Sequence, residues 1–341
     1  MKRVGMAELA RAAGVSVATV DRVLNGREAV RADTRALVAE AAARIGHPAA
    51  VQLRSAPADL PEVRFGVLLH KQGQNFYKAF AEELVRAVAA AQGVRGRLVL
   101  EYSTSQAPGE MAGHLRAMAG RCDVLAATAV NHPEVTAAVE DLAAQGLAVF
   151  TLLSDFAQGA RAGYFGLNNL KVGRTAAWAV AMAAREPGVV AIFVGGHRWH
   201  GHELRETGFR SYLRECAPHL TVLDPLVNLE TRQLTYEATL GLLARHPNLR
   251  GIYVAGGGME GAIAALRGAR PEGAIPMVVS ELTVESRAGL AEGGVTLVIA
   301  TPLDKLCRDL IAQMSRAVTE GGPQSGGQHF LPLDLHVAES I

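Results

Sequence analysis

Cysteine is scarce in this chain, which has three among its 341 residues: Cys122, Cys216 and Cys307. They lie far apart, are odd in number and show no spacing typical of a metal site, so we expect reduced thiols and no disulfide framework. No apolar run reaches the length that spans a bilayer, and the N-terminus lacks the hydrophobic stretch of a signal peptide. The sequence therefore disfavours a secreted or membrane-bound protein and predicts a cytoplasmic one.

Recognisable catalytic motifs are also missing. Ser154 and Asp155 are neighbours, but no serine elbow of the form G-x-S-x-G is present. His197, His200 and His202 lie close together, but no second cluster completes a set of metal ligands. We therefore expect no catalytic residue, no metal and no cofactor.

The N-terminal segment predicts a small three-helix domain. Apolar residues at helical spacing indicate a helix over residues 7–13 and a second over residues 17–24. Gly14 between them provides the positive φ that a tight turn needs, and Ser16 is placed to cap the second helix. Three apolar side chains of the second helix are expected to face inward: Val20, Val23 and Leu24. This arrangement is typical of the helix-turn-helix, whose second helix reads bases in the DNA major groove.

The same segment contains a longer pattern, which runs through Glu8-Leu9-Ala10, Ala13-Gly14-Val15-Ser16, Ala18-Thr19-Val20, Arg22-Val23-Leu24-Asn25, Val30, Arg31, Thr34-Arg35 and the closing run from Ala41 to Gly46. This pattern resembles the lactose-repressor (LacI-type) family of bacterial transcription regulators. The resemblance implies sequence-specific binding of double-stranded DNA by a homodimer. Two copies match a pseudo-palindromic operator whose half-sites lie about one helical turn apart.

The resemblance also implies roles for individual residues. Val17 and Ala18 contact base edges, where an apolar side chain meets a thymine methyl group, and Arg22 pairs with a guanine. Four other residues hold phosphates or the turn, and so set position rather than sequence: Ser16, Thr19, Asn25 and Thr34.

Two residues depart from the family's pattern. Asp21 stands where familiar members have a serine near the phosphates, and we expect it to pair with Arg22 or Lys2. Arg31 replaces the serine that caps the third helix, which leaves Asp33 to complement the helix dipole. Both departures leave the helix-turn-helix interpretation in place.

Charge is unevenly distributed along the chain. The net charge is +1, but residues 1–46 carry eight basic and five acidic side chains, which gives +3 and leaves −2 for the remainder. The basic surplus lies where DNA is expected to bind, although it is modest. Tight binding is therefore expected to need two copies.

Residues 47–62 form the expected hinge linker, because Pro48, Pro57 and Pro61 deny this segment a continuous helix. In the resembled family the segment becomes a short helix on DNA, and a leucine from each subunit enters the minor groove and kinks the duplex. Leu53 is the candidate for this wedge, and Arg54 for a phosphate partner. The alternative is a plain tether.

From Val63 onward, short apolar runs alternate with helical stretches, which predicts parallel sheets flanked by helices. The expected strands cover residues 64–69, 97–102, 123–127, 147–152, 189–194, 221–226, 251–255, 276–279 and 296–299, with one more over residues 330–337. The two rounds of this pattern, separated near Asn168, are similar to the two lobes of a periplasmic-binding-protein core. The C-terminus shows no leucine heptads, so a tetramerising coiled coil is not indicated.

The predicted α/β architecture therefore has three parts. A helix-turn-helix DNA-binding domain covers residues 1–46, the hinge linker covers residues 47–62, and a two-lobed ligand-binding and dimerisation core covers residues 63–341.

Ligands of open α/β sheets bind beyond the C-terminal ends of the strands, so the loops after the strands should line a cleft between the lobes. These loops combine amides, charged groups and rings, a chemistry suited to a small hydroxyl-rich molecule such as a sugar or polyol. The candidate contacts are Lys71, Gln72, Asn75, Phe76, Asn131, His197, Trp199, Arg205, Gly257 and Glu281. By the resemblance, Arg205 aligns with an arginine that contacts the effector, whereas the family's aspartate before Met259 is replaced by glycines.

An alternative function rests on the glycine-rich run from Gly256 to Gly261. The run satisfies G-x-G-x-x-G after a predicted strand, and Glu281 lies twenty residues beyond it, where a ribose-binding acid belongs. A nicotinamide-dependent oxidoreductase would leave residues 1–46 unexplained, and a solute-binding protein is disfavoured by the missing signal peptide. The sequence thus predicts a ligand-responsive repressor that is not an enzyme.

Overall fold

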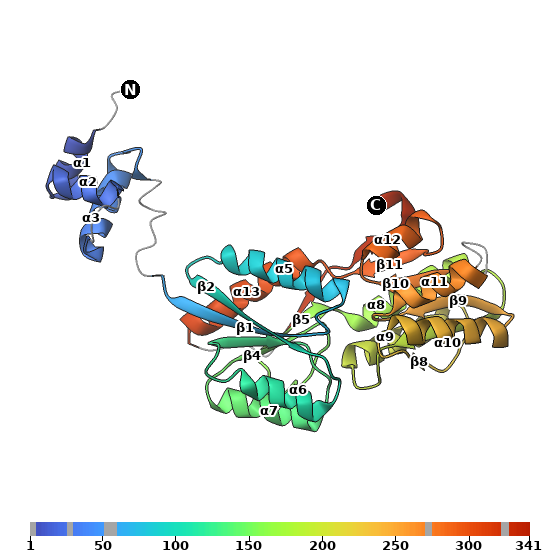
Figure 1. Ribbon diagram of the computed structural model, residues 1–341. Helices are drawn as coiled ribbons and strands as arrows, with labels where there is room; N and C mark the ends of the chain where they lie inside the picture. Colours follow the sequence, from blue (N-terminus) through green and yellow to red (C-terminus); the bar gives the residue numbers. More distant parts are fainter. Residues whose placement is uncertain (1–4, 26–29, 51–59, 270–274, 322–326) are drawn as a thin grey trace. The chain divides into compact units, whose positions relative to one another are not determined.

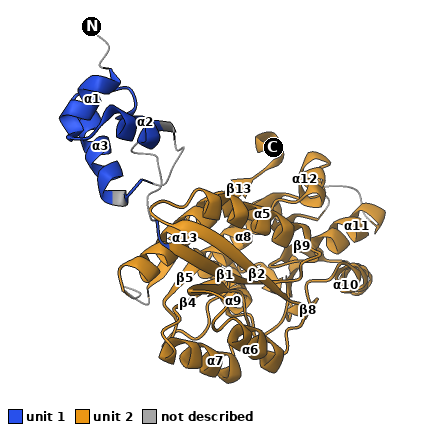
Figure 2. Cartoon of the chain, turned by 60° about the vertical axis from the view of Figure 1, so that its left-hand side comes forward, with its two compact units in different colours: residues 1–61 blue, residues 62–341 orange. Residues whose placement is uncertain are grey.

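The computed structural model describes residues 5–25, 30–50, 60–269, 275–321 and 327–341. The chain divides into two compact units, residues 1–61 and residues 62–341 (Figure 2). Each unit has a hydrophobic core of its own. Among the described helices, none combines the length and the apolar character needed to cross a membrane.

The first unit contains helices α1 (Met6–Ala13), α2 (Val17–Asn25) and α3 (Ala32–Arg44). Gly14 has a φ of 67° and ends α1, and the Thr19 amide donates a hydrogen bond of 3.1 Å to Ser16 Oγ at the start of α2. The small core consists of Leu9, Ala10, Val20, Val23, Val38, Ala41, Ala42 and Ala49. The predicted helix-turn-helix is confirmed, with α1 and α2 each one residue longer than expected.

The third helix starts without a side-chain cap. Arg31 flanks α3 and makes no capping hydrogen bond, while Asp33 lies in the first turn, as expected. At the other end of the helix, Arg44 Nη2 donates to the Ala12 carbonyl at 2.6 Å. This bond ties α3 to α1 across the domain.

The second unit contains two sheets, each covered by helices (Figure 1). Its strands are β1 (Glu62–His70), β2 (Arg95–Ser103), β3 (Val124–Ala127), β4 (Val149–Leu152), β5 (Gly163–Leu167), β6 (Gly188–Val194), β7 (Leu220–Val222), β8 (Leu226–Val227), β9 (Leu249–Val254), β10 (Met277–Ser280), β11 (Leu297–Ala300), β12 (Gln328–Leu331) and β13 (Asp334–His336). Its helices are α5 (Asn75–Ala89), α6 (Pro108–Ala117), α7 (Pro133–Ala144), α8 (Asn169–Ala183), α9 (His200–Cys216), α10 (Arg232–Arg245), α11 (Met259–Ala269), α12 (Val284–Ala291) and α13 (Leu303–Thr319).

The first sheet has the strand order β12-β5-β4-β3-β1-β2 and is parallel throughout. The second has the order β13-β11-β10-β9-β6-β7, with β8 also paired to β6 and β13 antiparallel to β11. Strands such as β3, whose four residues are all buried, read as unbroken apolar runs because helices cover both faces of a parallel sheet. We call the two sheets with their helices the first and second lobes.

The chain passes between the lobes three times. After β5 it enters α8, which packs on the second sheet, and after β11 it returns to α13, which packs on α5 and β1 of the first. The third passage lies between β12 and β13. The predicted α/β fold with two lobes is confirmed.

Three strand predictions need correction. Residues 330–337 do not form one strand, because Pro332 lacks an amide hydrogen and the chain there leaves the first sheet for the second. Residues 221–226 are likewise divided into β7 and β8 around Pro225. Strand β5 was not predicted, since its sequence contains two glycines in five residues.

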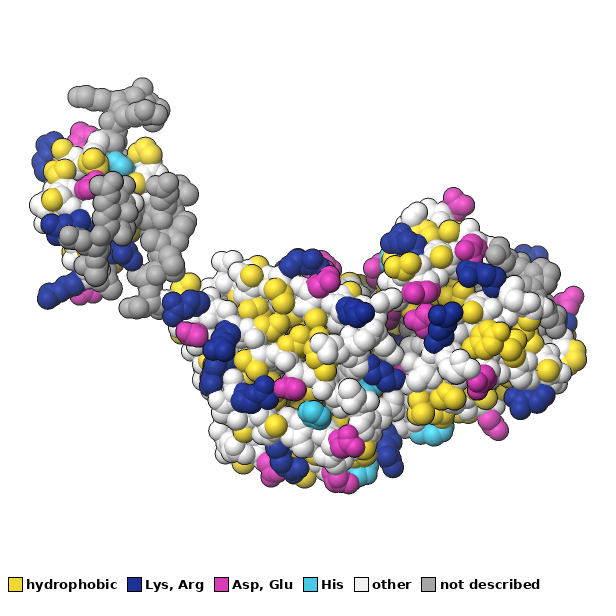
Figure 3. All heavy atoms as spheres, in the orientation of Figure 1, with side chains coloured by type: hydrophobic (Ala, Val, Ile, Leu, Met, Phe, Trp, Pro, Cys, Tyr) yellow, Lys and Arg dark blue, Asp and Glu magenta, His cyan; other side chains and the backbone are white. Residues whose placement is uncertain are grey.

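Charges on unit 2 are mixed. On the face seen in Figure 3, Lys and Arg side chains are interspersed with Asp and Glu, without a large region of one sign. The net charge of −2 calculated for residues 47–341 is consistent with this distribution.

A buried ion pair ties the C-terminal strand β12 to the first lobe. Asp155 and Arg161 side chains are each 4% exposed, and Asp155 Oδ2 accepts from Arg161 Nη2 at 2.8 Å and from Gln328 Nε2 at 3.1 Å. Thr151 Oγ1 donates to the other carboxylate oxygen, and Arg161 Nη1 donates to the Gly327 carbonyl.

Replacing Asp155 with alanine should lower the free energy of unfolding of unit 2 by about 3–5 kcal/mol, because the buried guanidinium loses its carboxylate. Urea unfolding followed by circular dichroism measures this loss. The matched control is Asp141→Ala, which breaks the exposed Asp141–Arg116 pair and should cost at most about 1 kcal/mol. Equal losses in the two variants would contradict the assigned role of Asp155.

Candidate functional site

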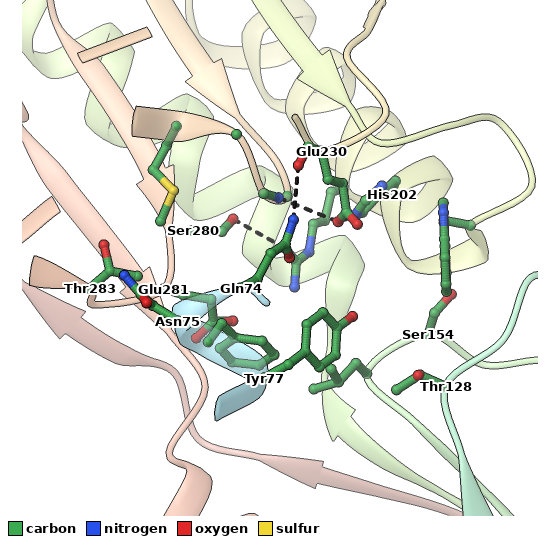
Figure 4. Close-up of a pocket in the computed structure, with 18 of the residues that line it drawn as sticks. Gln74, Asn75, Tyr77, Thr128, Ser154, His202, Glu230, Ser280, Glu281 and Thr283 are labelled. Carbon is green, nitrogen blue, oxygen red and sulfur yellow. Dashed lines mark hydrogen bonds and ion pairs between the residues drawn. The ribbon is translucent and has the colours of Figure 1, made fainter. Parts of the chain in front are cut away.

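A cavity of about 90 Å³ lies between the lobes, at the C-terminal ends of the parallel strands (Figure 4). Loops from both sheets contribute, as the open α/β architecture requires. From the first lobe the lining residues are Gln74, Asn75, Phe76, Tyr77, Thr128, Leu152, Leu153 and Ser154. From the second lobe and the passage into it they are Asn169, Trp199, His202, Arg205, Glu230, Gly256, Gly257, Gly258, Met259, Glu260, Ser280, Glu281 and Thr283.

The sequence candidates fall into three groups. Six of them line the cavity: Asn75, Phe76, Trp199, Arg205, Gly257 and Glu281. Lys71 does not line it but contacts the lining residue Glu230. Three others are exposed and lie outside the lining: Gln72, Asn131 and His197. Each of the short loops that carry these residues places only some of its side chains at the cavity.

Arg205 is fixed by partners from three parts of the chain. The residue is 8% exposed, its Nε donates to Asn169 Oδ1 at 2.7 Å, and its Nη1 donates to Ser280 Oγ at 3.1 Å and to the Ala255 carbonyl. Glycine makes this placement possible, since a Cβ at Gly173 of α8 would lie 1.9 Å from the Arg205 carbonyl oxygen. Helix α9 therefore approaches α8 backbone to backbone, and the guanidinium reaches the cavity wall.

Glu230 and His202 are cavity residues that the sequence candidates did not include. Glu230 follows β8, and the prediction of one strand over residues 221–226 hid where that strand ends. The Glu230 carboxylate lies 3.7 Å from His202 Nε2 and 3.9 Å from Lys71 Nζ, and it accepts a bond of 3.3 Å from the Gly257 amide. Residues of both lobes thus converge on one carboxylate.

The protonation of this group follows from its hydrogen bonds. The Gly195 amide donates to His202 Nδ1 at 3.0 Å, so the proton of a neutral ring lies on Nε2, toward Glu230. Burial lowers the pKa of His202 to about 4. Burial alone would raise the pKa of Glu230, but attraction to His202 when that ring is protonated, attraction to Lys71 and the bond from Gly257 hold it below its usual range. Near pH 7 the His202 ring is neutral, and Lys71 is then the cation that acts on the carboxylate. The pair is therefore a neutral imidazole beside a carboxylate.

Glu281 lines the cavity, and Thr301 fixes its carboxylate through two hydrogen bonds. Its two carboxylate oxygens accept bonds of 2.8 Å from the Thr301 amide and the Thr301 hydroxyl. Burial raises its pKa, although both bonds from Thr301 oppose this effect. The side chain thus joins the loops after β10 and β11.

Unusual backbone conformations gather around the cavity. Positive φ occurs at the non-glycine residues Lys71, Leu153, Leu229, Glu230 and Glu281, with values between 44° and 68°. Each lies in a loop that follows a strand. Such conformations cost free energy and persist where surrounding contacts fix them, as at binding sites.

The DNA-binding candidates can be placed within unit 1. Val17 is 47% exposed at the start of α2, and Ala18 and Arg22 are exposed on the same helix. Ser16 and Thr19 form the cap, with their hydroxyl oxygens 2.8 Å apart. Asp21 and Thr34 are half-buried. The side chain of Asn25 and all of Leu53 lie outside the described residues.

Two family models match the chain. Residues 5–48 match the bacterial regulatory proteins of the lacI family, and residues 65–322 match the periplasmic binding protein domain. The chain belongs to the LacI-type family of bacterial regulatory proteins. The resemblance found in the sequence is thereby confirmed. No curated protein matches the chain.

The core of this LacI-type chain is similar to solved sugar-binding proteins. An ABC transporter solute binding protein from Agrobacterium vitis, with bound D-fucose, has a TM-score of 0.75 at 12% identity and covers 82% of this chain and 96% of its own. A second from Agrobacterium vitis, with alpha-D-tagatopyranose, has a TM-score of 0.74 at 18% identity, covering 81% and 95%. One from Actinobacillus succinogenes, with D-allose, has a TM-score of 0.73 at 16% identity, covering 82% and 98%. At these identities the likeness shows the fold.

The glycine-rich run of the LacI-type chain has a packing explanation. A Cβ at Gly256 would lie 2.7 Å from the His202 ring and 2.9 Å from Glu230 Oε1, and one at Gly261 would lie 2.1 Å from the Arg232 carbonyl oxygen. The glycines make room for two buried side chains and for the approach of α11 to α10. The Gly257 amide, which a dinucleotide phosphate would need, already donates to a carboxylate. Packing therefore accounts for these glycines without a bound dinucleotide.

The neighbouring histidines do not converge. His197 is exposed, His200 Nδ1 lies 3.2 Å from Glu203, and His202 faces the cavity. Within the described part of the chain, no group of three or more His, Cys, Asp or Glu residues is arranged to hold a metal ion.

The low pKa of His202 makes unit 2 sensitive to acid. An unfolded histidine titrates near 6.5, whereas His202 in the fold has a pKa of about 4, so the unfolded chain binds the extra proton between these values. The free energy of unfolding should therefore fall as the pH drops from 6.5 to 4, with His202 contributing about 3 kcal/mol of the fall. Urea unfolding across this range should show a smaller fall for His202→Gln than for the unaltered chain. The exposed His197→Gln is the control, and an identical fall in both variants would contradict the burial argument.

Proposed function

We propose that this chain is a ligand-responsive transcription repressor. It binds a pseudo-palindromic operator as a homodimer in the cytoplasm, and a sugar or polyol in the interlobe cavity sets its operator affinity. The observation that carries the proposal is the presence, on one chain, of a helix-turn-helix unit and a two-lobed core whose cavity is lined by polar, charged and aromatic side chains. The proposed division is residues 1–46 for DNA, residues 47–62 for the hinge, and residues 63–341 for ligand and dimer contacts.

The chemistry of the cavity favours a hydroxyl-rich ligand. Amide, hydroxyl and carboxylate groups lie beside the rings of Phe76, Tyr77 and Trp199. Trp199 is 5% exposed, and its buried indole N–H has no hydrogen-bond partner among the described residues. A ligand hydroxyl would satisfy this donor while a ring covers the apolar face of the sugar. The similar solute binding proteins contain D-fucose, alpha-D-tagatopyranose and D-allose, which supports the same ligand class.

The small size of the cavity links ligand binding to a movement of the lobes, and through this movement to operator binding. A cavity of about 150 Å³ holds a benzene ring, whereas this one measures about 90 Å³, so a pyranose requires the lobes to separate. The bonds that such a movement strains include Lys71 Nζ to the Leu229 carbonyl and Gln74 Nε2 to the Glu230 carbonyl, both between lobes. A change in the angle between lobes alters the spacing of the two hinges in a dimer. By reciprocity, a ligand that weakens operator binding is itself bound less well by the DNA complex.

Arg22 is the proposed base-reading residue. Replacing it with alanine should weaken binding to the cognate operator by about 1–3 kcal/mol and relax preference at one base pair, because a bidentate pair with guanine is lost. Fluorescence anisotropy against palindromic duplexes and their single-base variants measures both effects. Arg11→Ala, in exposed α1, is the control and should leave the base preference intact. Unchanged operator affinity of the Arg22 variant would refute its role.

Arg205 is the proposed effector contact. Replacing it with lysine should abolish the response of operator binding to a sugar and polyol panel and leave operator affinity without ligand unchanged, since unit 1 is intact. The exposed Arg214→Lys on the same helix is the control. Thermal unfolding confirms that both variants are folded. A folded Arg205→Lys variant that responds normally would place the effector elsewhere.

A further inference from the structure

The turn at residues 228–231 presents a charged side chain in a fixed orientation. Leu229 and Glu230 have φ values of 49° and 54°, a strained conformation for non-glycine residues. The buried Asn228 holds it: its Oδ1 accepts from the Glu230 amide, and its Nδ2 donates to Thr235 Oγ1 and the Gly257 carbonyl, each at 2.9 Å. The turn is therefore preorganised with the Glu230 carboxylate at the cavity wall (Figure 4).

Space for this carboxylate is reserved by glycines from two other loops. A Cβ at Gly195 would lie 2.6 Å from Glu230 Cγ, and one at Gly257 would lie 3.0 Å from Glu230 Cβ. With the contact at Gly256 described above, three glycines surround one side chain. Such a built environment indicates a function for the carboxylate beyond the surface charge of a loop.

Acidic side chains outnumber basic ones in the described lining of the cavity. Its described lining contains the carboxylates Glu230, Glu260 and Glu281, and one guanidinium, that of Arg205. The Nε and Nη1 atoms of Arg205 already donate to protein partners. The guanidinium therefore cannot form the bidentate pair of hydrogen bonds that binds a phosphate or a carboxylate.

Lys71 does not provide a positive charge for binding an anionic ligand. Its ammonium lies 3.9 Å from Glu230 and donates to the Leu229 carbonyl, so it serves the same turn. The pKa of Glu230, which lies below its usual range, keeps the carboxylate ionised. An anionic ligand would meet a fixed negative charge, with Arg205, whose Nε and Nη1 already bind protein partners, as the cation of the described lining.

We propose that Glu230 restricts the effector to uncharged polyols and excludes phosphate esters and acids of the same sugars. The inference rests on the proposed function, because it concerns the effector cavity of the regulator. Like-charge repulsion within about 4 Å in such surroundings corresponds to a loss of affinity on the order of 100-fold or more.

The test is calorimetric titration of the full chain with matched ligands. D-tagatose, D-allose and galactitol are compared with the 6-phosphates of the two sugars and with a hexuronic acid. The unaltered chain should bind at least one uncharged member and bind its anionic counterpart about 100-fold more weakly. In Glu230→Gln this ratio should shrink at least tenfold, because the negative charge that repels the anion is removed. The exposed Glu140→Gln on α7 is the control and should keep the full ratio.

Two further variants keep the test decisive if Glu230→Gln proves unstable. Glu230→Asp retains the charge and should retain the discrimination, whereas Lys71→Met removes the compensating cation and should increase it. Equal binding of neutral and anionic forms by the unaltered chain, or an unchanged ratio in Glu230→Gln, would overturn the assignment. Binding of anionic members alone would also overturn it while preserving the regulator. If no member of either set binds, the effector class in the proposed function fails, and the role of Glu230 fails with it.

Discussion

A buried guanidinium must be surrounded by acceptors, and at Arg205 this requirement organises the second lobe around the cavity. Its partners come from the start of α8, the end of β9 and the end of β10, which are far apart in the sequence. Leaving such a charge unpaired in the interior costs several kcal/mol, so the three segments are fixed relative to one another. This arrangement also fixes the positions of Ser280 at the end of β10 and of Gly256 and Glu281 in the loops that follow β9 and β10.

The buried carboxylate of Glu230 is a second charge that must be compensated in the same region. Its carboxylate is buried beside a neutral histidine, with Lys71 of the other lobe as the nearby cation. Because this compensation crosses between lobes, separating the lobes exposes or unpairs the charge. Under the proposed function, opening of the cavity would change the electrostatics of Glu230 as well as the packing, and a bound ligand would act on both.

Glycine has two different uses in this chain. Gly14 ends α1 in a left-handed conformation and is required by the local backbone. Gly256 and Gly257 are required by the side chains of another segment, for which a Cβ would leave no room. The pattern G-x-G-x-x-G does not distinguish these uses, which is why it also fits a dinucleotide-binding loop that the structure does not contain.

The helix-turn-helix could be predicted from the sequence because its determinants are local. Ser16 caps α2 by accepting a bond from the Thr19 amide, three residues away, and Val20 and Val23 follow the helical period. The alternation of strands and helices in the two lobes was predictable for the same reason. The cavity position of Trp199 was expected from its loop after β6, and that of Arg205 from the resemblance to the LacI-type family. The role of Glu230 was not, since it depends on Lys71, His202 and Gly257, which lie 159, 28 and 27 residues away. Nor was the division of residues 330–337 between two sheets, because the neighbouring strand, and not the alternating pattern, decides which edge each half joins. Sequence by itself determined most of the elements and the family, whereas the tertiary structure decided which charges meet, because electrostatic compensation acts through space and not along the chain.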